Sequence, residues 1–185
     1  MRILGWNCWG ICNAPTVRAL KALIRGRNPS IVFLSETKAS DSRMNDVARM
    51  IGFQNFVVIG PRGRAGGICL LWSDDLDVDI LEFNSNMIAI HVSDGSVGWS
   101  VIGCYGPPYK TKRVKAWIDL CALLVSINGL WVCFGDFNVV VDDSEKEGGK
   151  LRGPSTPNFL KELLFDLATI DLSFSGCQFT WRNKR

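Results

Sequence analysis

The sequence has no apolar run long enough to cross a lipid bilayer, and its apolar N-terminal stretch is too short for a signal peptide. It also has no internal repeat, no low-complexity tract and no interdomain linker. We therefore expect no membrane partner. The 185 residues are expected to form one domain, residues 1–185, with enough chain for a sizeable core.

Metal-binding and disulfide patterns are also missing. The chain has one histidine, His91, and an odd number of cysteines, seven. Cys8 and Cys12 are four residues apart, but no second cysteine pair and no nearby histidine completes a zinc site. Five cysteines lie inside apolar runs, where a free thiol behaves as a small hydrophobic side chain. The pattern indicates reduced, mostly buried thiols in an intracellular, reducing compartment.

Neither sign of charge is in large excess. The formal net charge is +3, and the hydrophobic and charged fractions are ordinary for a globular protein. A charge of this size permits a polyanionic partner but does not indicate one.

Hydrophobic periodicity predicts strands that alternate with helices at both ends of the chain and strands alone in its middle. The predicted strands span 3–7, 30–35, 53–59, 68–72, 76–83, 87–92, 99–105 and 130–134, with short closing strands at 171–172 and 179–181. Helices are predicted from Asn13, a possible cap, to residue 27, over 42–51, around 114–125 and over 156–167. This order favours layered α/β packing, with sheets inside and helices outside.

The tetrapeptide Gly135-Asp136-Phe137-Asn138 follows a predicted buried strand. Asp and Asn two apart on an extended chain point the same way, because side chains alternate faces. A carboxylate beside an amide at a strand end suits the handling of a metal, a water or a phosphate. The alternative is an Asx-rich turn after a strand.

Three more predicted strands end in polar residues: Asn7, Glu36 and Tyr105. In layered α/β proteins, ligands tend to bind where strand ends gather. We therefore treat these three residues, with Asp136 and Asn138, as one candidate site.

In this order and at these intervals, the segments resemble the endonuclease/exonuclease/phosphatase superfamily of metal-dependent phosphodiesterases. The matching pieces are Trp6-Asn7, Leu34-Ser35-Glu36-Thr37, the segment 103–108, Gly135-Asp136-Phe137-Asn138 and Phe179-Thr180-Trp181. Within the superfamily the chain is most similar to the endonuclease domain of plant non-LTR (LINE-type) retrotransposons. The resemblance implies a four-layer α/β sandwich, with two inner mixed β-sheets flanked by helices.

The resemblance also implies a role for each residue of the candidate site. Glu36 would bind Mg²⁺, with Mn²⁺ as an alternative ion. Asn7 would orient the metal ligand and the phosphate, and Tyr105 would donate to the scissile phosphate. Asp136 would align or deprotonate the attacking water, and Asn138 would hold a phosphate oxygen. The structural alternatives are a solvated Glu, a turn Asn and a packing Tyr.

Substrate contacts are carried over less directly. Thr180 and Asn183 would touch the DNA backbone, and Arg62 and Arg64 of the Gly-rich loop 61–67 could meet its phosphates. The alternatives are an ordinary strand Thr and a solvated charged loop.

The chain departs from the family pattern in two places. The family continues with a strand that carries an Asp and with a Ser-Asp-His segment, and the sequence reaches Arg185 before either. Alternation with Ile88, Ile90 and Val92 places His91 on the solvent side of its strand, so we do not expect it to replace the family's histidine. Some members also carry an Asp where this chain has Trp9.

The resulting expectation is a Mg²⁺-dependent, DNA-nicking endonuclease of retrotransposon origin, with access to the nucleus and no small organic cofactor. Because the closing strands and the Asp-His unit are missing, we expect an incomplete fold with an exposed sheet edge and weak or no activity. One alternative is a non-catalytic retroelement remnant that binds metal or nucleic acid. Another is a phosphodiesterase for small phosphate esters or phospholipids.

Overall fold

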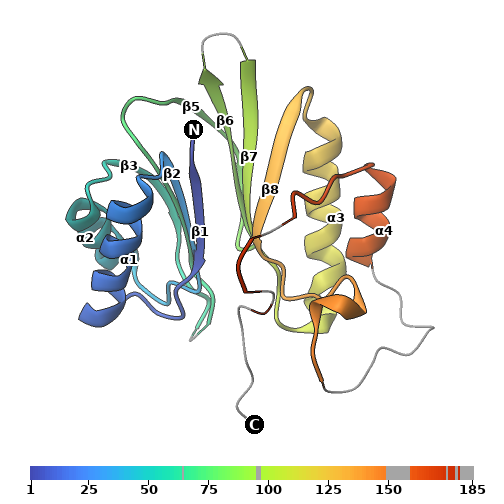
Figure 1. Ribbon diagram of the computed structural model, residues 1–185, viewed down its shortest axis with the longest axis horizontal. Coiled ribbons are helices and arrows are strands. Elements are labelled where there is room, and N and C mark those ends of the chain that lie inside the picture. Colours follow the sequence, from blue (N-terminus) through green and yellow to red (C-terminus); the bar gives the residue numbers. More distant parts are fainter. Residues whose placement is uncertain (64, 95–96, 149–158, 174, 178, 180–185) are drawn as a thin grey trace.

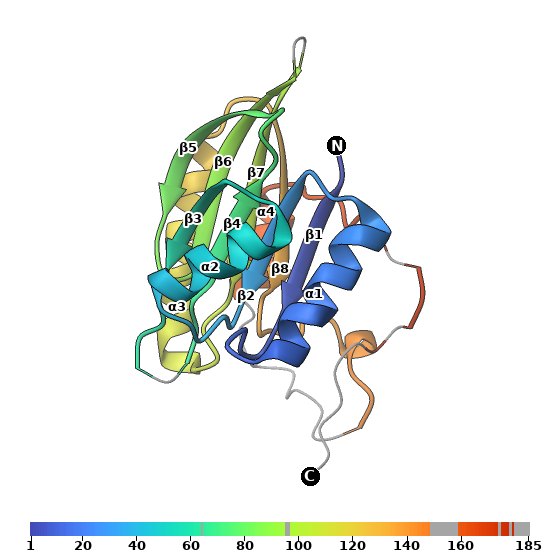
Figure 2. The same ribbon diagram turned by 90° about the vertical axis from the view of Figure 1, so that its left-hand side faces the viewer.

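Two four-stranded β-sheets face each other, and helices cover their outer faces (Figures 1 and 2). The computed structural model describes residues 1–63, 65–94, 97–148, 159–173, 175–177 and 179. The first half comprises β1 (Ile3–Asn7), α1 (Ala14–Arg27), β2 (Ile31–Ser35), α2 (Asp41–Ile51), β3 (Asn55–Ile59) and β4 (Ile68–Trp72). The second comprises β5 (Asp77–Phe83), β6 (Met87–Asp94), β7 (Val97–Tyr105), α3 (Lys110–Ser126), β8 (Leu130–Asp136), the 3₁₀ turn η1 (Asp143–Glu145) and α4 (Phe159–Asp166). The expected four-layer α/β sandwich is confirmed.

Each sheet is mixed and contains one parallel pair. The strand orders are β1-β2-β4-β3 and β5-β6-β7-β8, with β1 parallel to β2 and β7 parallel to β8. Parallel neighbours end at the same edge of a sheet, so each pair brings two carboxyl ends together. Within the described residues, β1 and β8 each have a strand partner on one side only.

The core consists of three apolar layers. One lies between the first sheet and helices α1 and α2, one between the two sheets, and one between the second sheet and helices α3 and α4. Phe33 of β2 and Phe134 of β8 meet edge to face across the middle layer, with ring centroids 5.8 Å apart. The pairing joins the two halves near the strand ends that carry the candidate site.

Local sequence signals account for where the helices begin and end. The side chain of Asn13 caps α1 by accepting a hydrogen bond from Thr16 N at 2.8 Å, as the sequence predicts. Gly52, with φ of 87°, ends α2 in the left-handed conformation that glycine adopts without strain.

One predicted strand is wrong. Residues 171–172 form no strand, and the side chains of Ile170 and Leu172 are 85% and 76% exposed. Two residues are too few to form a ladder without a neighbouring strand to pair with. Of the last predicted strand, Phe179 is described and is not in a strand, while residues 180 and 181, like the predicted start of α4 at residue 156, lie outside the described residues.

All seven cysteines are free thiols. Cys8, Cys69 and Cys104 are buried, Cys121 and Cys133 are partly buried, and Cys12 and Cys177 are exposed. Within the described part of the chain, no helix is both long enough and apolar enough to span a bilayer.

Candidate active site

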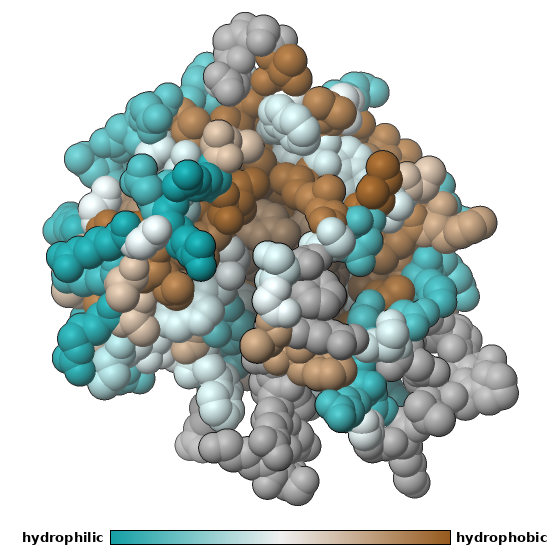
Figure 3. All heavy atoms as spheres, in the orientation of Figure 1, coloured by the Kyte–Doolittle hydropathy of each residue, from teal (hydrophilic) through white to brown (hydrophobic). Residues whose placement is uncertain are grey.

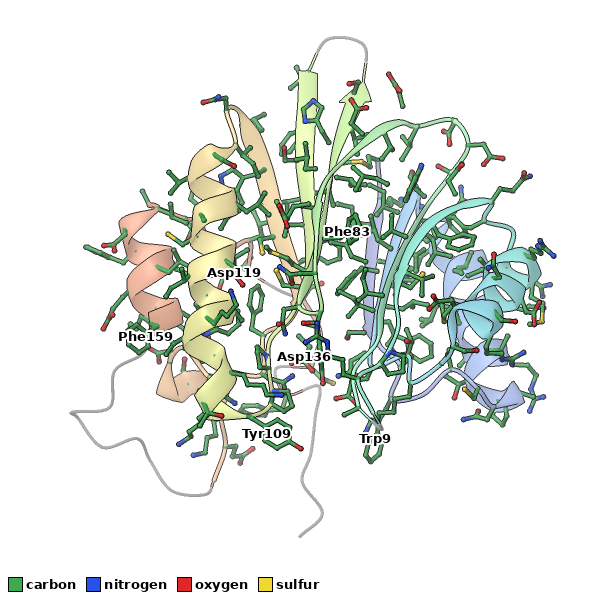
Figure 4. The ribbon with its side chains drawn as sticks, turned by 180° about the vertical axis from the view of Figure 1, so that it is seen from behind. Trp9, Phe83, Tyr109, Asp119, Asp136 and Phe159 are labelled. Atoms are coloured by element: carbon green, nitrogen blue, oxygen red, sulfur yellow. The ribbon has the colours of Figure 1, made fainter. Side chains whose placement is uncertain are left out.

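The four polar strand ends meet where the two sheets approach each other. Asn7, the last residue of β1, pairs in register with Ser35 next to Glu36, and Tyr105 of β7 pairs with Asp136 of β8. Figure 4 shows Asp136 between the two halves. The two parallel pairs therefore bring two polar residues from each half to a common place.

A hydrogen bond between Asn7 and Asp136 joins the halves. The amide Nδ2 of Asn7 donates to Asp136 Oδ2 at 2.7 Å, and the backbone N–H of Asn138 donates to the other carboxylate oxygen at 2.9 Å. Both oxygens of Asp136 are thus held, and its carboxylate has a fixed orientation.

Glu36 lies just beyond the end of β2 and has two partners. Its Oε1 accepts from the Tyr105 hydroxyl at 3.1 Å, and its Oε2 forms an ion pair with Lys38 Nζ at 2.9 Å. The side chain is 18% exposed, so water reaches it from one side. The carboxylate is therefore mostly enclosed but still reached by solvent.

The backbone around Glu36 is bent and tied down. Glu36 and Lys38 adopt left-handed φ values of 52° and 49°, which non-glycine residues rarely do. Four backbone bonds hold this segment: Gly10 N to Glu36 O at 2.8 Å, Ile11 N to Thr37 O at 2.9 Å, Thr37 N to Gly67 O at 3.0 Å and Lys38 N to Gly66 O at 3.1 Å. Strained backbone held in this way is often found at functional sites.

Tyr105 is buried, and its hydroxyl lies close to both carboxylates. The pKa of its phenol is raised well above the usual range, mainly by burial. The negative charge of Glu36, the hydrogen bond to Glu36 and the charge of Asp136 raise it further, while a hydrogen bond with the Asn138 side chain lowers it. The phenol therefore stays protonated and can donate its O–H as a neutral group. It links Glu36 of the first half to Asp136 and Asn138 of the second.

The position of Asn138 differs from the sequence prediction. β8 ends at Asp136, and Asn138 has a left-handed φ of 51°, so alternation along a strand does not orient it. The bond from its N–H to Asp136 is that of an Asx turn, the structural alternative in the sequence. The turn still brings Asn138 to the site, where its Nδ2 donates to Gly106 O at 2.8 Å.

The donor set fits a hard divalent cation that keeps most of its waters. Among the described residues, no three His, Cys, Asp or Glu side chains are grouped to enclose a metal. Mg²⁺ is commonly bound through one or two carboxylates with water completing its shell, and Glu36, with Asp136 and Asn7 nearby, offers that chemistry. A tetrahedral zinc cage is not formed by these residues.

Of the four other residues named from the sequence, the structure describes only Arg62, which forms no hydrogen bond or ion pair with the described residues of this network. Arg62 is exposed in the loop that ends at Gly67, next to the Glu36 segment. Arg64, Thr180 and Asn183 lie outside the described residues.

His91 is remote from the network, as the sequence predicts, but the solvent-side placement is wrong in part. It does lie opposite Ile88, Ile90 and Val92, which face the core between the sheets. The other face of β6 is covered by α3, so His91 is half-buried, and its Nδ1 is 3.4 Å from Ser100 Oγ. Its register partner Ser100 is five residues from Tyr105, which is roughly 17 Å along a strand.

Three residues at the site were not identified from the sequence as contacts. Lys38 forms an ion pair with Glu36, and its ammonium group lies 5.2 Å from the ring centroid of Trp9. Tyr109, four residues after Tyr105, is the residue at the start of α3. The position of Lys38, two residues after Glu36, places it close enough in the sequence to have been named as a candidate partner of that carboxylate. Its pairing with Glu36 depends on the left-handed backbone, which the sequence does not reveal.

The chain belongs to the Endonuclease/Exonuclease/phosphatase family, whose model matches residues 4–185. A comparison with curated proteins finds no match.

Solved structures share the fold at low sequence identity. The endonuclease domain of TRAS1, a telomere-specific non-LTR retrotransposon, aligns with a TM-score of 0.64 and 17% identity over 90% of this chain and 71% of that one. A variant of the 3′ phosphatase NExo from Neisseria, bound to a product DNA hairpin, aligns with a TM-score of 0.57 and 17% identity. The alignment covers 78% of this chain and 60% of that one. Truncated Caenorhabditis elegans TDP2 aligns with a TM-score of 0.54 and 16% identity over 75% of this chain and 62% of that one. The chain spans only 47% and 48% of the length of two longer TDP2 chains.

Proposed function

We propose that this protein is a Mg²⁺-dependent phosphodiesterase that nicks DNA, with Mn²⁺ as an alternative ion. The observation that carries the proposal is the joined network of two carboxylates, two amides and a protonated phenol, assembled from both halves by the Asn7–Asp136 and Tyr105–Glu36 hydrogen bonds. The TRAS1 endonuclease domain and the DNA-bound NExo phosphatase support DNA as the substrate class and a retrotransposon endonuclease as the type. The proposal takes residues 1–185 as one domain that acts on DNA in the nucleus.

The network divides the work of hydrolysing a phosphodiester. Glu36 and Asn7 would hold the divalent ion, which neutralises charge on the phosphate when bound. The Tyr105 hydroxyl would turn from Glu36 to donate to a phosphate oxygen, and the Asn138 amide, held on Gly106 O, would turn its other N–H from Tyr105 to a second phosphate oxygen. Asp136, fixed by Asn7 and by the Asn138 N–H, accepts a proton from the attacking water.

Activity is expected to be low. No histidine belongs to the network within the described residues, so the base role rests on Asp136 alone. A positioned general base contributes about 10²–10⁴-fold to a rate, and both oxygens of this carboxylate already accept hydrogen bonds.

The test is nicking of a supercoiled plasmid with Mg²⁺ and with EDTA. Glu36→Gln and Asp136→Asn keep side-chain shape and remove charge, and Asp119→Asn on α3, whose carboxylate pairs with Lys115, is the matched control. We expect Mg²⁺-dependent nicking that falls about 10²-fold or more in both site variants and is unchanged in the control.

The same assay separates the alternatives. Folded protein that binds DNA without nicking it would favour a non-catalytic binding module. Hydrolysis of a small phosphodiester such as bis(p-nitrophenyl) phosphate, with the plasmid left intact, would favour the small-ester alternative.

A further inference from the structure

Two large aromatic side chains stand exposed beside the candidate site, one on each half. Trp9 is 79% exposed and Tyr109 is 65% exposed. Trp9 comes two residues after Asn7, and Tyr109 comes four residues after Tyr105. Figure 4 shows both at the same end of the molecule, on either side of Asp136.

The backbone that presents Trp9 is part of the site itself. Trp9 has a left-handed φ of 45°, its N–H donates to Asn7 Oδ1 at 3.2 Å, and Gly10 N donates to Glu36 O at 2.8 Å. The indole is therefore directed outward by the same bonds that shape the site. An exposed indole held in this way offers a flat apolar face to a ligand.

Each aromatic ring has a lysine next to it. Lys38 Nζ lies 5.2 Å from the Trp9 ring centroid, and Lys112 Nζ lies 5.9 Å from that of Tyr109. A flat ring with an ammonium group over one face matches one nucleotide, since a base can stack on the other face while the cation meets a phosphate.

We propose that Trp9 and Tyr109 are stacking platforms for unpaired nucleobases on either side of the phosphate held by the network. The inference deepens the proposed function, on which it rests, and names its substrate class as single-stranded or locally unpaired DNA. In an intact duplex both faces of each base are covered by neighbouring bases. The exposed rings of Trp9 and Tyr109 would then have no base face to stack on. A strand with unstacked bases supplies a free face to each ring.

The experiment is fluorescence anisotropy with an end-labelled single-stranded DNA oligonucleotide in EDTA, so that no cleavage occurs. Trp9→Ala and Tyr109→Ala are each expected to weaken binding about 5- to 50-fold, and Trp9→Phe and Tyr109→Phe to restore most of it. Trp99→Ala, a partly exposed residue six positions from Tyr105 on β7, is the control and is expected to bind normally. Circular dichroism verifies that each variant is folded.

Two further ligands make the result decisive. On an abasic strand of equal length the alanine variants are expected to match the wild type, since only phosphates remain to be bound. On a duplex of the same sequence they are expected to lose little. Equal losses on all three ligands, or no loss on the single strand, would overturn the stacking proposal.

Failure of the stacking proposal differs from failure of the proposed function. Binding in EDTA does not depend on hydrolysis, while plasmid nicking by Glu36→Gln tests the metal site alone. Normal nicking by that variant would reject the catalytic assignment and leave the stacking measurement unaffected.

Discussion

At the scale of single residues, the polar side chains of the site form hydrogen bonds and an ion pair with one another in the absence of a ligand. Both oxygens of Glu36 and both oxygens of Asp136 are engaged. Lys38 in particular places a positive charge on Glu36, where a divalent cation would bind. The protein's own cation therefore keeps the carboxylate in position and competes with the metal for it.

This competition gives the first prediction. Replacing Lys38 by Met keeps the length of the side chain and removes its charge, so a divalent ion approaching Glu36 meets less repulsion. We expect Mn²⁺ to bind about three- to tenfold more tightly, measured by isothermal titration calorimetry. Lys115→Met, which removes a lysine paired with Asp119 on α3, is the matched control, and weaker binding by the Lys38 variant would contradict the argument.

The second prediction concerns the protonation of Tyr105. Burial and the Glu36 carboxylate raise its pKa, so the folded protein resists ionisation above the usual tyrosine value of about 10. The chain has only two tyrosines, so in Tyr109→Phe any tyrosinate absorbance comes from Tyr105. We expect none up to about pH 11 in folded protein, and a normal titration after unfolding in urea.

The sign of the linked stability change follows from this shift. Because the unfolded chain releases the Tyr105 proton first, the contribution of this group to stability is complete below about pH 10 and is lost as pH rises further. A folded-state titration near pH 10 would show that the phenol is not held between carboxylates.

At the scale of elements, the turn after β8 works because two backbones approach more closely than any side chain would allow. Gly106 N donates to Asp136 O at 2.8 Å, and a Cβ on Gly106 would lie 1.9 Å from Phe137 O. This close approach seats the Asn138 amide on Gly106 O. Glycine at this position is thus a requirement of the site's geometry.

Gly106→Ala should therefore displace the segment 136–138. We expect a loss of roughly 1–3 kcal/mol in the free energy of unfolding, measured by urea denaturation, because the clash is with backbone that cannot rotate away. Gly26→Ala in α1 meets no atom within 4 Å and should stabilise by about 0.5–1 kcal/mol. An unchanged midpoint for Gly106→Ala would show that the turn tolerates the wider spacing.

What the sequence predicts at this scale depends on how local the signal is. The start of α1 is predictable because Asn13 caps its own helix, and β2 is predictable because its five residues are all buried. Asn7, Glu36, Tyr105 and Asp136 are identifiable as strand ends, and the parallel pairings do gather them. The Asx turn at Asn138 appeared in the sequence only as the alternative, and the lysine on Glu36 was missed, because both depend on left-handed backbone that the sequence does not reveal.

At the scale of the whole molecule, the site depends on how the two halves pack. Asn7 and Glu36 come from the first half, and Tyr105, Asp136 and Asn138 from the second. Figure 3 shows hydrophobic residues gathered in the middle of the face between the halves. Packing between the sheets therefore sets the distances within the site.

Phe33 and Gly103 form one close contact in that packing. Phe33 is 1% exposed, and a Cβ on Gly103 would lie 2.3 Å from its ring, so the ring of β2 rests on the bare backbone of β7. Gly103→Ala alone should destabilise by about 1–3 kcal/mol through overpacking, and Phe33→Leu alone by about 1–2 kcal/mol through the space it leaves.

The double variant gives the last prediction. A leucine vacates ring volume that the alanine methyl can fill, so the combined loss should be smaller than the sum by about 0.5–2 kcal/mol in urea denaturation. Mn²⁺ affinity should fall in each single variant and recover in the double variant. The reason is that Glu36 and Asp136 reach the site from opposite sides of the contact between Phe33 and Gly103. Additive losses in stability would contradict the close fit of Phe33 on Gly103. Recovered stability without recovered Mn²⁺ binding would mean that the spacing of the halves does not govern the site.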